Sequence, residues 1–262
     1  MKRIASLLML AARSTLWKAA GITLASCLAE AGLFLAALSG WQDTVRTAYY
    51  EYSNPMGLEG LLMQYPLSWC FRIGLVLVCA VLAFLGWEGS SRVSYTLRRL
   101  SVGHRALTLL WAGYGFFCLL FFWAAHLGTL LALCAAALPR LAPEFSGPQA
   151  LFLACYRDPY LHSLLPLDDC LLWVRNLSMC AALGTVAASF SFQRRMGRRA
   201  FAILPLAALS ALCFPLPTGS FEFGGPAEFL RPYLYDGIFY SAEGLPSVLG
   251  PVLLFVSLCA LA

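Results

Sequence analysis

The chain has 262 residues, of which 60% are hydrophobic and only 12% charged, with a net charge of +5. Soluble domains carry roughly 25% charged residues, so this composition excludes an ordinary soluble protein. The positive charge does not indicate nucleic-acid binding, because the basic residues form no single patch with interleaved aromatics. They lie in short clusters beside apolar runs, which is typical of membrane proteins.

The first eighteen residues, 1–18, predict an amphipathic helix on the inner leaflet. Ile4, Leu7, Leu8 and Ala11 recur at helical spacing among basic residues. A basic leader that only orients the protein is the simpler alternative. A cleavable signal peptide is not expected, because a longer apolar run follows at once without a clean cleavage site.

Six apolar runs follow, and they predict six transmembrane helices in an all-α fold. The runs are Ala19–Leu38, Trp69–Trp87, Ala106–Leu138, Cys170–Phe192, Ala200–Leu216 and Leu245–Ala262. A span needs about 20 residues, so the third run is too long for a simple crossing and must tilt or project. The last two runs are short and contain prolines, so their boundaries stay open.

Charge asymmetry predicts the orientation. Twelve of the eighteen basic residues precede the first run, separate the second from the third, or separate the fourth from the fifth. Eleven of the thirteen acidic residues fall in the other connections. Cytoplasmic loops carry the Lys/Arg excess, so both termini are expected in the cytoplasm and the protein in the plasma membrane.

The outer connections are longer than the inner ones. The segment 217–244 has aromatic residues and short apolar turns, which predict short extracellular helices before the last span. Three cysteines, Cys70, Cys155 and Cys170, lie near the outer face in this topology, and a disulfide among them stays open. The other seven fall in apolar runs and form no CxxC zinc pattern.

Enzymatic motifs are missing from the sequence. No GxxxxGK[ST], HExxH or GxSxG occurs, and the three histidines lie in three different regions. We expect no catalytic residue, metal or cofactor in this chain. A polytopic membrane enzyme is a weak alternative because clusters of His, Asp and Glu are absent.

Two charged residues fall inside apolar runs. Glu30 lies near the middle of the first run, where an acid costs roughly 2.5–3.5 kcal/mol on insertion scales and usually has a partner. Arg175 lies two turns into the fourth run. We hypothesise that they pair inside the bundle. The alternatives are a protonated Glu30 bonded to a neighbouring helix and an Arg175 that snorkels to outer headgroups.

Two further features carry structural predictions. His126 is about 30 Å along the third helix by a rise of 1.5 Å per residue, and we interpret it as an ordinary polar residue at the outer interface. Cys180, Gly184 and Ala188 form a small-xxx-small line suited to close helix packing. Whether their neighbour belongs to this chain or to a second copy stays open.

The inner segment 90–105 is the strongest candidate for a docking element. Val93, Leu97 and Leu100 recur at helical spacing beside Arg98 and Arg99, which gives a short helix with a small apolar face. The alternative is a solvated positive loop.

The layout resembles the permease subunit of a type-2 ABC exporter. The resemblance rests on the basic leader, the six runs, the stretch SYTLRRLSVGHR after the second run, and WVRNLSMCAALGTVAASFSFQRRMGRR from Trp173 to Arg199. It covers the whole chain in layout but only these two stretches in wording. The short fifth and sixth runs depart from the family pattern.

The resemblance implies one permease domain over residues 1–262. It implies a coupling helix that docks into a separate ATPase subunit, which would hold the ATP and magnesium. The matching residues are Ser94, Tyr95, Thr96, Leu97, Arg98, Arg99, Leu100 and Ser101. A second permease, identical or related, is expected to complete the pore. The bundle carries little charge, which favours a hydrophobic or amphipathic cargo. The rival interpretation is a membrane scaffold without transport activity.

Overall fold

The computed structural model describes residues 2–47, 58–63, 66–84, 103–141, 146–167 and 170–195, with short pieces at 207–208, 251–253 and 255–256. Its elements are helices, and no strand occurs in these ranges, which confirms the all-α prediction for them. The helices are α1 (Lys2–Thr47), α2 (Leu58–Met63), α3 (Ser68–Ala83), α5 (His104–Ala137), η2 (Leu138–Arg140), α6 (Ala150–Arg157), α7 (Pro159–Leu164) and α8 (Cys170–Arg195).

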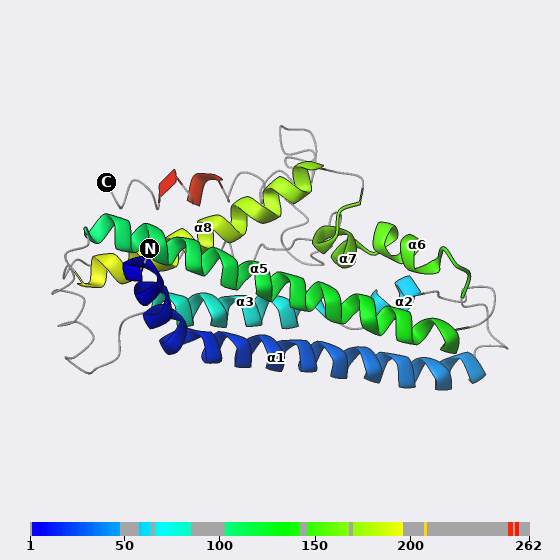
Figure 1. Ribbon diagram of the computed structural model, residues 1–262. Helices are drawn as coiled ribbons and strands as arrows, with labels where there is room; N and C mark the ends of the chain where they lie inside the picture. The colour runs from blue at the N-terminus through cyan, green and yellow to red at the C-terminus, as the bar shows by residue number, and fades with distance from the viewer. Residues whose placement is uncertain are drawn as a thin grey trace, which may run out of the picture.

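Four helices form the bundle, and they alternate in direction along the chain (Figure 1). α1 and α5 lie side by side and run the same way, because Thr15 bonds to Tyr114 and Ser26, further along α1, bonds to His126. α3 and α8 run the opposite way. One end of the bundle therefore holds the start of α1, the end of α3, the start of α5 and the end of α8.

Short helices cover the other half of the bundle. α2 and α6 lie near the far ends of α1 and α5, and α7 lies near the middle of α5 (Figure 1). Asp158 caps α7 by accepting a 2.7 Å hydrogen bond from the amide of Leu161, and Pro159 occupies the first helical position. Trp123 on α5 donates its indole N–H to the carbonyl of Leu164, which ties α7 to the bundle.

The predicted interfacial helix is the first part of α1 rather than a separate element. Its first turns bend away from the rest of α1 (Figure 1). Ser14 and Thr15 both donate to the carbonyl of Ala11, a side-chain bond that often bends helices. Leu7 and Ala11 are buried in a small cluster formed mainly with residues of α5. Part of the apolar face that the sequence assigned to lipid therefore packs against protein.

α5 and α8 make the tightest helix crossing among the described elements. A Cβ on Gly184 would lie 2.8 Å from the amide nitrogen of Phe116 and 3.0 Å from the carbonyl oxygen of Ala112. A Cβ on Gly115 would lie 3.2 Å from the Cα of Gly184. The small-residue line on α8 is thus used for close packing as predicted, and its neighbour is α5 of the same chain.

Within the described part of the chain, two helices are long and apolar enough to cross a membrane, over Ser6–Gly40 and Ala106–Arg140. Ser68–Ala83 is a shorter apolar helix. The described residues therefore support two spans by length and composition, fewer than the six predicted. The predicted fifth and sixth spans, the coupling helix at residues 94–101 and the extracellular segment 217–244 all lie outside the described residues, apart from short pieces of the two spans.

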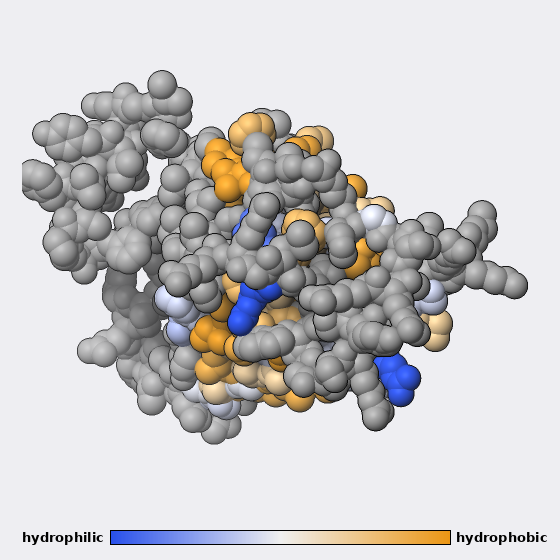
Figure 2. All heavy atoms as spheres, turned by 90° about the vertical axis from the view of Figure 1, so that its left-hand side faces the viewer, coloured by the Kyte–Doolittle hydropathy of each residue, from blue (hydrophilic) through white to orange (hydrophobic). Residues whose placement is uncertain are grey.

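Large apolar side chains are exposed on every helix of the bundle. Examples are Trp17 and Leu28 on α1, Ile73 on α3, Phe121 on α5 and Val174 on α8. Figure 2 views the end where α1 begins and α8 ends, and it shows orange apolar side chains beside only a few blue hydrophilic ones. Exposed apolar area on this scale marks contact with lipid or another protein.

Candidate functional site

The candidate site is a buried polar cluster where α1, α3, α5 and α7 meet. Glu30 on α1 and His126 on α5 are both 0% exposed, and the Nδ1 of His126 lies 2.7 Å from the Oε2 of Glu30. A buried ion pair in low dielectric needs good geometry and further hydrogen bonds to be tolerated. Both conditions hold here.

Ser26 and Tyr160 provide those further hydrogen bonds. The Nε2 of His126 lies 2.9 Å from the hydroxyl oxygen of Ser26, and Ser26 donates its own proton to the carbonyl of Thr23. Tyr160 on α7 donates to the Oε1 of Glu30 over 3.0 Å. Burial, and then the Glu30 carboxylate, raise the pKa of Tyr160 well above 10, so its phenol stays a donor at neutral pH.

Every polar atom of the pair has a hydrogen-bond partner. The imidazole lies between Glu30 at Nδ1 and Ser26 at Nε2, and the carboxyl group lies between His126 and Tyr160. Such complete hydrogen bonding is what makes an acid and an imidazole tolerable at a fully buried position.

Aromatic rings enclose the imidazole. The ring centroids of Phe122 and Phe71 lie 4.5 Å and 5.2 Å from that of His126. Gly74 on α3 allows Ser26 to approach, because a Cβ there would lie 2.9 Å from both the Cβ and the Oγ of Ser26. The cluster therefore lies in an apolar shell that strengthens its electrostatic interactions.

The predicted pairing of Glu30 with Arg175 is wrong. Arg175 is buried at 3% exposure, and it donates to the hydroxyl oxygen of Ser163 over 3.1 Å and to the side-chain oxygen of Asn176 over 3.1 Å. Burial also contradicts the snorkelling alternative. α7 explains both results, since it brings Tyr160 to Glu30 and Ser163 to Arg175. Neither the apolar runs nor their spacing indicated this short helix.

His126 also differs from the sequence interpretation of an ordinary polar residue at the outer interface, because it is fully buried and contacts Glu30. The sequence placed Glu30 at mid-membrane and His126 at the outer interface, yet the two side chains are in contact. The discrepancy arises because α5 begins beside the turns of α1 that precede Lys18, where Leu107 packs in one cluster with Leu7. A distance counted along α1 from Lys18 therefore underestimates how far Glu30 lies from the end of the bundle where α5 begins.

Cys27 completes the cluster. Its sulfur, a carboxylate oxygen of Glu30 and a ring nitrogen of His126 all lie within 4.8 Å of one another, and the three residues are buried. Cys27 precedes Glu30 by three residues, so both side chains point to the same face of α1. The described cysteines, including Cys70, Cys155 and Cys170, are free thiols, so no disulfide forms among these three.

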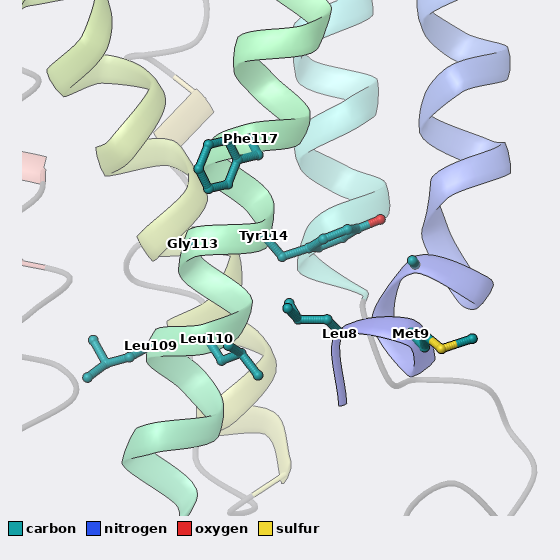
Figure 3. Close-up of a pocket in the computed structure, with 8 residues that line it drawn as sticks. Leu8, Met9, Leu109, Leu110, Gly113, Tyr114 and Phe117 are labelled. Atoms are coloured by element: carbon teal, nitrogen blue, oxygen red, sulfur yellow. The ribbon is translucent and has the colours of Figure 1, made fainter. Parts of the chain in front are cut away.

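An apolar groove lies away from this cluster, between the first turns of α1 and the first half of α5. It has a volume of about 470 Å³. Figure 3 shows Leu8 extending from α1 toward α5, and the Tyr114 ring extending from α5 toward α1. The groove offers no charged group, so it suits an apolar chain and no chemistry.

Comparison with known proteins gives no relative. No family model, curated protein or solved structure matches this chain.

Proposed function

We propose that the chain is an integral membrane transport subunit, the permease of a type-2 ABC exporter. It would lie in the plasma membrane with both termini in the cytoplasm. A separate ATPase subunit would bind ATP and magnesium, and a second permease would complete the pathway. A hydrophobic or amphipathic cargo fits the apolar exterior and groove.

The supporting observation is the distribution of polarity. Large apolar side chains face outward on α1, α3, α5 and α8, while Glu30, His126, Arg175 and Asn176 are buried between helices. In a soluble protein the exposed apolar side chains would favour aggregation, and the buried polar side chains would cost free energy of desolvation. In a bilayer both features are expected, because intramembrane polar groups turn inward and pair.

The directions of the helices fit this proposal. α3 ends and α5 begins at the end of the bundle that also holds the start of α1 and the end of α8. Of the basic residues that the sequence analysis assigns to the cytoplasm, the described Arg13 and Arg194 lie on the first turns of α1 and the last turn of α8. An ATPase on the cytoplasmic face would meet the segment 90–105 there.

A pull-down in mild detergent tests this proposal. We expect an ATPase subunit to co-purify with the tagged wild-type chain and to be lost when Leu97, Arg98 and Leu100 are changed to Asp. Arg13→Asp, an exposed change on α1, is the control and should retain the ATPase. If no ATPase accompanies the wild type, the exporter proposal fails and a membrane scaffold becomes the better interpretation.

A further inference from the structure

Three metal-binding side chains converge in the buried cluster. Cys27, Glu30 and His126 offer a sulfur, an oxygen and a nitrogen that all lie within 4.8 Å of one another. Metal–ligand bonds of about 2.0–2.3 Å would place tetrahedral ligand atoms roughly 3.3–3.8 Å apart. The cluster therefore needs only side-chain adjustments of about an ångström to enclose an ion.

The hydrogen bonds around these residues match those that support metal ligands. A metal-binding histidine almost always uses its other ring nitrogen in a hydrogen bond, which holds the ring in place, and a ligating carboxylate is itself hydrogen-bonded. Here the Nε2 of His126 lies 2.9 Å from the hydroxyl oxygen of Ser26, and Nδ1 faces Glu30. Tyr160 donates to the Oε1 of Glu30, the oxygen that does not contact His126.

The chemistry of the three side chains suits a divalent ion. A bound M²⁺ would face a thiolate, a carboxylate and a neutral imidazole, whose two negative charges would balance its own. A fully buried position favours such a balance, because an uncompensated charge there is costly.

We propose that Cys27, Glu30 and His126 bind one divalent transition-metal ion of the zinc class. The sulfur and nitrogen ligands favour zinc, cobalt or copper over magnesium and calcium, which prefer oxygen. Three protein ligands leave the fourth tetrahedral position for water or another small ligand. None of the three ligands belongs to the proposed ATPase-coupling segment 90–105, so this site goes beyond the proposed transport function.

Cobalt titration of the full-length protein in detergent tests this site. Co²⁺ reports its ligands by absorption, and we expect visible ligand-field bands plus a near-ultraviolet thiolate band that saturate at one ion per chain. Zn²⁺ should abolish the bands, and excess Mg²⁺ should not.

Matched cysteine variants decide the assignment. Cys27→Ser should lose the thiolate band, whereas Cys118→Ser, on α5 outside the cluster, should behave as wild type. Glu30→Gln should weaken Co²⁺ binding by at least tenfold. Because Glu30→Gln could unfold the protein, its elution from size exclusion is compared with that of the wild type.

Absence of bands in the wild type, or an unchanged thiolate band in Cys27→Ser, overturns the proposal. Either result leaves the ATPase pull-down unaffected, so the two proposals fail separately.

Discussion

The crossing of α5 and α8 makes a sharp prediction about Gly184. In Gly184→Ala the added methyl carbon would lie 2.8 Å from the Phe116 amide nitrogen, 3.0 Å from the Ala112 carbonyl oxygen and 3.1 Å from the Gly115 carbonyl carbon. Ordinary contacts of a Cβ begin at 3.4 Å. All three neighbours are backbone atoms that cannot rotate away, so the two helices must separate.

The expected magnitude follows from two opposing effects. Overpacking costs about 1–3 kcal/mol, and rigid backbone neighbours place this site at the upper end. Alanine gains about 1 kcal/mol over glycine in helix propensity. We therefore expect Gly184→Ala to lose about 2 kcal/mol in the free energy of unfolding.

Gly113→Ala is the matched control, because it lies on the same helix as Gly115 and a Cβ there meets nothing within 4 Å. It should gain up to about 1 kcal/mol from propensity alone. Gly115→Ala should fall between them, since its Cβ would lie 3.2 Å from the Cα of Gly184. Thermal unfolding in one detergent, followed by tryptophan fluorescence, ranks the three variants. If Gly184→Ala is as stable as Gly113→Ala, the helices do not cross with their backbones in contact.

Three further predictions concern the buried cluster, each measured by thermal unfolding. Gly74→Ala should cost about 1–3 kcal/mol, because its methyl group would push Ser26 away from His126; an unchanged midpoint would contradict the close approach. Tyr160→Phe should cost about 1.5–3 kcal/mol, the usual value for a hydrogen bond to a charged group. The folded protein keeps the Tyr160 proton above pH 10, where the unfolded chain releases it. Raising the pH above 10 therefore favours the unfolded state, and wild-type stability should fall there. Tyr160→Phe should lack this part of the fall. Glu30→Leu and His126→Leu should each cost about 3–5 kcal/mol while the double variant recovers most of the loss; additive losses would refute the pairing.

The sequence predicted the helical class and most of the bundle. Apolar runs are a direct signal, and they located α3, α5 and α8 to within a few residues. The small-residue line around Gly184 predicted a close crossing, because small side chains in a long apolar helix have few other uses. Its partner could not be predicted, since one sequence does not say which helix faces which.

The polar cluster was only half predicted. Glu30 was conspicuous because an acid in an apolar run needs a partner, but the choice of Arg175 followed charge and ignored depth. The sequence analysis placed His126 at the outer interface, whereas the structure brings it to Glu30. The i, i+3 spacing of Cys27 and Glu30 was a signal that the sequence analysis did not use, because it places two possible ligands on one face of a helix. Tyr160 carried no signal, because its role depends on α7 folding back to the middle of α5.

The stability of the Glu30–His126 pair bears on why it is present. Replacing a buried ion pair by apolar residues is often neutral or stabilising, so packing alone does not explain an acid and an imidazole at 0% exposure. If the doubly apolar variant is as stable as the wild type, the pair contributes nothing to folding that leucines cannot supply. Its hydrogen bonds to Ser26 and Tyr160 would then serve a ligand, and a divalent ion held by Cys27, Glu30 and His126 is the ligand that this side-chain set suits best.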